Sequence, residues 1–189
     1  MTNNNEAFGP LAALIGTWEG SKGMDVSPEP DGMEASPYYE TLSFDAVGDV
    51  TNAEEQTMMV VRYYQTVTRT ADNKVFHDET GYLMWDADRQ VIMQSLVIPR
   101  GVALLAGGSH DGSVGADRAV TIDVAAREDD PHFNIAQSPF MTEKARTTGF
   151  DHRISVNGDT LVYTETTYLD IYGRSVEHTD ENTLSRVQD

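Results

Sequence analysis

The stretch RTTGFDHRISVNGDTLVYTETTYLDI, residues 146–171, decides the fold class of this 189-residue chain. Apolar and polar side chains alternate along both halves of the stretch, and β-branched and aromatic residues are frequent, as in half-buried β-strands. Between the halves, Asn157-Gly158-Asp159 supplies the positive φ angles that a tight hairpin turn needs. The stretch therefore predicts two antiparallel strands, residues 146–156 and 160–171.

The same period-two pattern recurs along most of the chain, whereas an apolar pattern of helical spacing almost never persists over three turns. In addition to the two strands above, strands are expected at residues 15–20, 37–46, 56–69, 74–85, 90–98, 101–107, 118–126 and 175–187. A short helical turn is expected at residues 8–14. Residues 21–36 and 129–144 are expected to be long connections, the second with room for one helical turn.

About ten strands joined by short turns indicate an up-and-down meander, and closure into a barrel leaves that meander no unpaired edge. The last expected strand is polar on both faces, with His178, Asp180 and Asn182 on one face and Glu177 and Thr179 on the other. Because neither face suits a dry, filled core, we expect a cavity that is partly wet. The expected fold is all-β, a closed antiparallel up-and-down barrel with a short N-terminal helical turn.

Composition excludes several classes of function. The 31 acidic and 13 basic residues give a formal net charge of −18, which repels the phosphates of nucleic acids and anionic membrane surfaces. The chain has no cysteine, so disulfides and zinc–thiolate sites are excluded. Any bound transition metal must therefore be held by His, Met, Tyr or carboxylate side chains.

The length of the chain and the pattern of its apolar residues indicate how it is divided into domains. Residues 1–7 are expected to be a disordered N-terminus, and residues 8–189 are expected to form a single barrel domain. No apolar run approaches the roughly 20 residues needed to span a bilayer, and the polar N-terminus lacks the apolar segment of a signal peptide. We therefore expect a cytoplasmic monomer or homodimer that binds a small molecule, with neither nucleic acid nor membrane as a partner.

The run Gly16-Thr17-Trp18-Glu19-Gly20, at the start of the first strand, resembles the Gly-x-Trp signature of the calycin barrels. In calycins, an Arg of the last strand often packs against this Trp. Arg186 occupies the corresponding position in this sequence, so its guanidinium would stack on the indole ring of Trp18. The alternative is that Trp18 is an ordinary core residue and Arg186 is exposed to solvent.

Two further motifs narrow the resemblance to the nitrobindin-like haem-binding barrels, which are also filed as fatty-acid-binding-protein-like. Residues 76–82, FHDETGY, are similar to the family's His-x-Glu-x-Gly-Tyr pattern. In Gly173 … His178 … Leu184 … Arg186, the histidine stands where the family places its proximal haem ligand, ahead of a Leu and a basic residue. The resemblance spans nearly the whole chain, and it implies a calycin-like barrel with haem b as its cofactor.

The resemblance implies that His178 is the axial ligand of the haem iron, and Asp180, two residues further along the same face, could hold the other ring nitrogen. The alternative is a polar lumen histidine that is hydrogen-bonded to a neighbouring strand. His77 would be a distal polar group at the rim of the pocket, unless it is only a solvated rim residue. The remaining histidines are expected at the surface: His110, His132 and His152.

Arginine, tyrosine and methionine side chains are further candidate contacts for a ligand. An inward arginine would pair with a fatty-acid carboxylate or a haem propionate, but Arg62 and Arg100 are both expected outside. Tyr64 and Tyr163 could supply hydroxyl groups to such a ligand, but the sequence does not decide whether their side chains face the lumen. The methionines suit either a pocket for a flat apolar ligand or ordinary filling of the barrel; the most notable are Met58, Met59, Met84 and Met93.

The expected function is to bind a small apolar ligand in the barrel cavity. Haem b is the first candidate, and the resemblance then implies nitric oxide binding and isomerisation of peroxynitrite to nitrate at ferric iron, so that enzymatic activity would belong to the cofactor. A metal-free carrier of fatty acid or another apolar metabolite is the alternative. A barrel filled by its own side chains, acting through its surface, is a third. No hydrolase or phosphate-loop motif is present.

Overall fold

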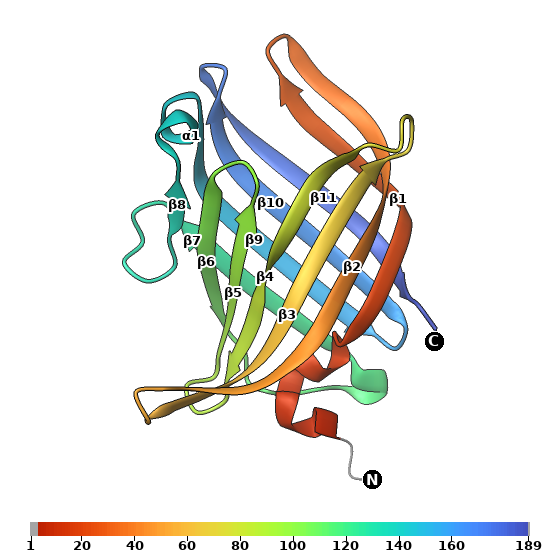
Figure 1. Ribbon diagram of the computed structural model, residues 1–189, viewed down its shortest axis with the longest axis vertical. Helices are drawn as coiled ribbons and strands as arrows, with labels where there is room; N and C mark the ends of the chain where they lie inside the picture. Colours follow the sequence, from red (N-terminus) through yellow and green to blue (C-terminus); the bar gives the residue numbers. More distant parts are fainter. Residues whose placement is uncertain (1–3, 189) are drawn as a thin grey trace.

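The computed structural model describes residues 4–188, which form a barrel of long, tilted strands (Figure 1). The strands are β1 (Gly16–Glu29), β2 (Gly32–Asn52), β3 (Gln56–Arg69), β4 (Val75–Asp86), β5 (Val91–Ile98), β6 (Val102–Ser109), β7 (Val120–Arg127), β8 (Ile135–Gln137), β9 (Ala145–Asn157), β10 (Thr160–Ile171) and β11 (Arg174–Arg186). The helices are the 3-10 segments η1 (Asn4–Ala13) and η2 (Ala116–Arg118) and the α-helix α1 (Pro139–Lys144). Residues 1–3 of the expected disordered segment 1–7 lie outside the described residues, and the rest of that segment is part of η1.

Ten antiparallel strands close the barrel, which confirms the expected fold class. The strand order is β5-β4-β3-β2-β1-β11-β10-β9-β7-β6, and pairing of β5 with β6 completes the circle. The short β8 pairs with β6 in addition. Together with α1 it occupies the connection expected at residues 129–144. Ser138 begins α1 by accepting a hydrogen bond from the Met141 backbone N–H at 3.3 Å.

The expected loop at residues 21–36 is wrong, because β1 and β2 continue through it as one long hairpin. The two strands pair from Gly23 opposite Tyr38 up to Glu29 opposite Gly32, with an irregular register between Gly20 and Gly23. Gly23 lets the Tyr38 ring lie across the backbone, where a Cβ would come within 2.0 Å of it. The glycines that resembled loop signals therefore mark an irregularity within a strand.

Backbone pairing between β1 and β11 is short. The two strands are in register only at Trp18 opposite Arg186 and at Glu19 opposite Ser185. Further along, side chains connect the β1–β2 hairpin to β11. Arg174, at the start of β11, donates two hydrogen bonds of 2.7 Å to the backbone oxygens at the tip of that hairpin. We call the length of β1 and β11 beyond Glu19 the side-chain seam.

Trp18 and Arg186 meet where the last strand joins the first. The Arg186 guanidinium carbon lies 4.0 Å from the centre of the fully buried Trp18 ring. The same guanidinium donates to the backbone oxygens of Ile15 and Ala13 at 2.7 and 2.9 Å. A side chain at Gly16 would lie 2.8 Å from an Arg186 nitrogen, so the glycine leaves room for this contact.

The apolar core lies at the end of the barrel that η1 covers (Figure 1). Phe8, Leu11 and Leu14 of this N-terminal segment are buried against the inner faces of the strands. Burial of these side chains fills one end of the lumen and leaves the opposite end as the place for a ligand. Within residues 4–188, no helix has both the length and the apolar composition that crossing a membrane requires.

Candidate functional site

The inner face of β10 shows where the lumen stops being filled. Leu161 and Tyr163 face inward and are buried, whereas every residue from Thr164 to Ile171 is half-buried. The register with β11 is uninterrupted, so side chains two positions apart keep facing the lumen along the whole strand. Inward-facing side chains that stay accessible to solvent indicate an open cavity at this end.

Apolar side chains contribute to the wall of this open half. Leu169 of β10 pairs with Val176 of β11, and both lie on the inward face beside Thr167 and His178, which also pair with each other. All four side chains are half-buried. The filled half, in contrast, keeps a cavity of only about 10 Å³, which is room for a single water-sized particle. The filled half therefore has no room for a ligand larger than a water molecule.

His178 projects from β11 into the open half of the lumen, and its side chain is 20% exposed. Its Nε2 lies 2.8 Å from Asp25 Oδ1 on β1 and 3.5 Å from Asp180 Oδ2. Burial lowers the pKa of His178, but the hydrogen bond that its Nε2 donates to Asp25 and the charge of Asp180 outweigh it and raise the pKa above its usual value. The expected partner Asp180 is thus present, and Asp25 is the closer one.

Asp25, His178 and Asp180 are the one group within residues 4–188 whose donor atoms could converge on a metal ion, since these atoms lie within 4.8 Å of one another. Burial raises the pKa of Asp180 above its usual value, and the neighbouring His178 opposes the shift. Asp180 Oδ1 is buried and has no hydrogen-bond partner among the described residues. The donor set of one imidazole and two carboxylates gives this part of the lumen a negative character.

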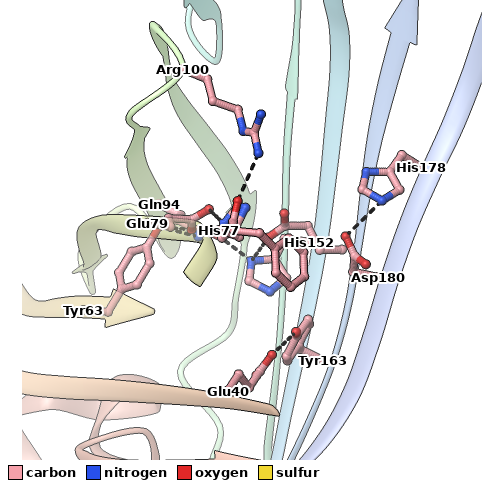
Figure 2. A network of polar contacts seen from close by, with 12 residues as sticks. Glu40, Tyr63, His77, Glu79, Gln94, Arg100, His152, Tyr163, His178 and Asp180 are labelled. Carbon is pink, nitrogen blue, oxygen red and sulfur yellow. Dashed lines mark hydrogen bonds and ion pairs between the residues drawn. The ribbon is translucent and has the colours of Figure 1, made fainter. Parts of the chain in front are cut away.

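His77 lies on β4, at the rim of the open half, with 28% of its side chain exposed. Its Nε2 is 3.3 Å from Glu79 Oε2. Figure 2 shows His77 on the side of the lumen opposite His178 and Asp180. Burial raises the pKa of Asp180, and a positive charge on His77 opposes that rise.

A chain of hydrogen bonds runs from His77 into the lumen (Figure 2). Buried Glu79 accepts a hydrogen bond of 2.6 Å from the Tyr63 hydroxyl. That hydroxyl accepts one of 3.0 Å from Gln94 Nε2, and Gln94 Oε1 lies 2.9 Å from His152 Nδ1. Tyr63, Glu79 and Gln94 are each at most 3% exposed, so this polar layer is shielded from bulk water.

The expectation that His152 lies at the surface is wrong. Its side chain is 10% exposed, and burial lowers its pKa to about 4. The neighbours Asp151 and Arg153 suggested a solvated segment, but they face outward, where they pair with Arg127 and Asp123. Strand alternation was the signal that could have found it, because residues 152, 154 and 156 share one face of β9.

A second buried cluster lies deeper in the lumen and was not predicted. The Tyr163 hydroxyl donates to Glu40 Oε2 at 2.7 Å, and Tyr38 and Tyr163 hydroxyls are 3.2 Å apart. Burial raises the pKa of Glu40 to about 7 despite the hydrogen bond from Tyr163. Burial also raises the pKa of Glu165, helped by the charge of Glu79. The lumen therefore holds carboxyls that keep their protons more strongly than usual.

The two remaining histidines differ in their surroundings. His110, expected at the surface, has only 10% of its side chain exposed; its ring meets the Trp85 ring edge to face at 5.8 Å. The expectation overlooked that a histidine in an irregular segment can pack on a core aromatic side chain. His132 is exposed, as expected.

The other weighed residues mostly face away from the lumen. Arg62 is exposed and pairs with Asp45, whereas Arg100 is exposed at the turn between β5 and β6 and donates to the Phe76 backbone oxygen (Figure 2). Tyr163 faces the lumen, whereas Tyr64 is exposed.

The methionines do not gather around the cavity. Met84 and Met93 pair with each other across β4 and β5 and alternate with core residues such as Leu83 and Ile92, so they face outward. Met59 packs against the core, and Met58 is buried. These side chains therefore provide no methionine-lined ligand pocket.

Comparisons with known proteins agree with this geometry. Residues 7–186 match the family model described as a THAP4-like, heme-binding beta-barrel domain. The crystal structure of Rv2717c from M. tuberculosis superposes with a TM-score of 0.69, at 23% sequence identity, over 100% of this chain and 99% of that chain. A comparison with curated protein sequences finds no match.

The structural likeness at this identity shows a shared fold, and the family match goes further. It covers nearly the whole described chain, including both rims of the open half and the strand that carries His178. The family is one of haem-binding barrels, which supports haem as the cofactor. The chain belongs to the family of THAP4-like, heme-binding β-barrel domains.

Proposed function

We propose that this protein binds haem b in the open half of its lumen, with His178 as the axial ligand of the iron. The observation that carries the proposal is the position of His178, which faces the accessible cavity beside the apolar side chains of Leu169 and Val176. Asp25 holds one of its ring nitrogens at 2.8 Å. A carboxylate on one nitrogen orients the imidazole and leaves the other nitrogen for a metal.

The residues around His178 fit such a group. Leu169, Ile171 and Val176 offer apolar surface to a porphyrin, and their partial exposure means that no other part of the chain covers them. Haem iron needs only one protein ligand, so Asp25 and Asp180 remain as the groups that orient His178. His77, across the cavity, is a polar group on the side where an exogenous ligand would lie.

Haem held by His178 would supply nitric oxide binding and the isomerisation of peroxynitrite to nitrate, the chemistry implied by the resemblance to nitrobindin-like barrels. The chain contributes the axial ligand through His178, apolar contacts on one side of the cavity and the polar layer of Glu79 and Gln94 on the other. A confined cavity favours small ligands over larger ones.

The metal-free carrier is less well supported. Both candidate arginines for a fatty-acid carboxylate are engaged with other groups, Arg62 with Asp45 and Arg100 with the Phe76 backbone oxygen. The inward hydroxyl of Tyr163 is bonded to the carboxyl of Glu40. The observations therefore favour haem.

The test is haem titration followed by absorbance. The parent protein is expected to give a ferric Soret band, and His178→Ala is expected to lose most of its haem affinity because the iron–protein bond is gone. His77→Ala should retain haem. His132→Ala, which alters an exposed histidine, serves as the matched control. A parent protein without a Soret band, or a His178→Ala variant that binds haem as tightly as the parent, would overturn the proposal.

A further inference from the structure

Three ligand side chains gather at the side-chain seam, where β1 and β11 are neighbours without a backbone ladder between them. Asp25 belongs to β1, and its backbone pairs with Ser36 of β2. His178 and Asp180 belong to β11, whose backbone at these positions pairs with β10. The register between β1 and β11 ends at Glu19. Side chains therefore make the contact across the seam at this level.

The donor atoms of these side chains are spaced like the ligands of one metal ion. Nε2 of His178 lies 2.8 Å from Asp25 Oδ1 and 3.5 Å from Asp180 Oδ2, and the ligand atoms of all three residues lie within 4.8 Å of one another. Zinc bonds to nitrogen and oxygen of about 2.0–2.1 Å hold tetrahedral ligand atoms about 3.4 Å apart. The separation of His178 and Asp180 already has this length, and small adjustments of the carboxylates bring the other separations to it.

The negative charge of the two carboxylates exceeds what their neighbours balance. The imidazole between them contributes at most one positive charge, and within residues 4–188 no lysine or arginine forms an ion pair with Asp25 or Asp180. His77, across the cavity, is paired with Glu79 at 3.3 Å. Asp180 Oδ1 is buried and accepts no hydrogen bond from the described residues. Because a buried carboxylate oxygen without a partner is costly, a cation at this place would stabilise the folded protein.

The three ligand side chains are shielded from bulk water and can still be reached by an ion. The exposed fractions of the side chains are 11% for Asp25, 20% for His178 and 26% for Asp180. Zinc at a site with three protein ligands takes a water molecule as its fourth ligand. The partial exposure of the cluster leaves access for both the ion and this water.

We propose that, in the haem-free protein, Asp25, His178 and Asp180 bind one divalent transition-metal ion of the zinc type, which joins β1 to β11 across the seam. One imidazole with two carboxylates suits Zn²⁺ and Co²⁺, whereas Mg²⁺ and Ca²⁺ prefer oxygen ligands alone. The ion takes the place of the proton between His178 Nε2 and Asp25, and this proton leaves to water. The inference goes beyond the proposed haem binding and does not depend on it.

The first measurement is metal binding by the purified, metal-stripped and haem-free protein. Co²⁺ is expected to bind in a one-to-one ratio and to give visible absorption bands, which Zn²⁺ removes by displacement and Mg²⁺ leaves unchanged. Asp180→Asn and His178→Ala each remove a ligand. They should weaken Zn²⁺ binding by more than about 100-fold, because even groups that only orient a ligand are worth about 10–100-fold. Glu177→Gln, which neutralises an exposed carboxylate on the outer face of β11, is the matched control.

The second measurement is amide hydrogen exchange with and without Zn²⁺, and it asks whether the ion joins the two strands. At a Zn²⁺ concentration about 100 times the dissociation constant, openings that release the ion become about 100-fold rarer. Exchange in residues 23–29 is therefore expected to slow by up to this factor. Exchange in β5, four strands away from β1, should keep its rate. In Asp180→Asn, Zn²⁺ should change neither segment.

The outcomes separate the metal site from haem binding. A parent protein that binds Zn²⁺ no more tightly than Asp180→Asn, or whose exchange in residues 23–29 does not respond to Zn²⁺, overturns the metal site even if it takes up haem. Equal weakening by Glu177→Gln also overturns it, because attraction to the overall negative charge would then account for the binding. A parent protein that binds Co²⁺ as expected but takes up no haem overturns the proposed function and leaves the metal site intact.

Discussion

Glu40 is a carboxyl in the interior of the barrel whose ionisation is opposed by its surroundings. Burial raises its pKa from 4.5 to about 7. Between these pH values the folded protein keeps a proton that the unfolded chain has lost, so stability falls as the pH rises through this window. One pKa unit is worth about 1.4 kcal/mol, so the loss attributable to Glu40 amounts to about 3 kcal/mol.

Glu40→Gln is expected to remove this loss, because glutamine does not ionise and can still accept from the Tyr163 hydroxyl. Urea unfolding at several pH values between 4.5 and 7.5 would measure it. The free energy of unfolding of the variant should decline less than that of the parent over this range. Parallel curves for the two proteins would contradict the assignment of the titration to Glu40.

The positions of some residues of the candidate site could be predicted from the sequence, and those of others could not. The family resemblance and strand placement put His178 on an inward face with Asp180, and the structure has both there. Its nearer partner Asp25 could not be predicted, because it lies in a segment whose glycines and prolines resembled a loop. His152 was hidden by charged neighbours, since charge in sequence says nothing about which face of a strand a side chain occupies.

At the scale of elements, the barrel depends on how its last strand meets its first. β1 pairs with β2, and β10 pairs with β11, over most of their lengths, whereas β1 and β11 pair at two positions only. The stacking of Arg186 on Trp18 strengthens this short junction, and its three backbone and side-chain acceptors hold the guanidinium in place. The expected contact between the two ends of the chain is present.

A double-mutant cycle tests the energetic value of this junction. Trp18→Phe and Arg186→Leu are compared alone and combined. The double variant is expected to lose about 0.5–2 kcal/mol less stability than the sum of the two single losses, because each substitution alone already removes the stacking. Chemical denaturation of the four proteins measures the coupling. Effects that add within error would mean that the stacked geometry contributes no stability of its own.

Arg174 is expected to hold the tip of the β1–β2 hairpin, since its guanidinium donates to the backbone oxygens of Glu29 and Gly32. Arg174→Ala should increase amide hydrogen exchange in residues 23–35 by about fivefold, as the loss of about 1 kcal/mol of hydrogen bonding implies. Residues 16–19 should be unaffected. Arg62→Ala, which breaks an exposed ion pair elsewhere, is the control. Unchanged exchange at the hairpin would contradict the role of Arg174.

The hairpin also shows why element boundaries were harder to predict than element types. Pro28 and Pro37 interrupt the apolar alternation, and prolines argue against a central strand. In the structure, Pro28 lies beyond the residues of β1 that pair with β11, so its missing N–H breaks no ladder. Pro37 lies just outside the pairing of β2 with β3. Whether an edge is unpaired depends on tertiary structure, which local sequence does not reveal.

For the whole molecule, the fold class could be predicted from the alternation of apolar and polar residues, and the family could be predicted from three short motifs. The strand periodicity predicted the closed barrel because every strand must bury one face and an open meander would leave two edges. A partly wet cavity was predicted from the polarity of the last strand, but its restriction to one half of the lumen was not. The detailed lining of that half could not be predicted, since it depends on the registers of ten strands.

The net charge of −18 leads to a prediction for the molecule as a whole. At physiological salt, the protein is expected to show no measurable affinity for duplex DNA or for vesicles of anionic lipid, because both surfaces repel it. Electrophoretic mobility shift and vesicle co-sedimentation are the measurements. Tight binding that weakens with added salt would contradict this expectation.

The side-chain seam between β1 and β11 is a place where few backbone hydrogen bonds join two neighbouring strands of the wall, as is the junction of β6 and β7, which are in register only at Gly107 opposite Ala125. At the other junctions, separating two strands breaks a ladder of backbone hydrogen bonds, whereas beyond Glu19 the contacts of the seam include Asp25–His178 and the hydrogen bonds of Arg174. A flat molecule could therefore slide in edgewise through the wall and need not descend through the mouth. Because His178 belongs both to the seam and to the candidate ligand site, the bound molecule would itself become part of the closed wall.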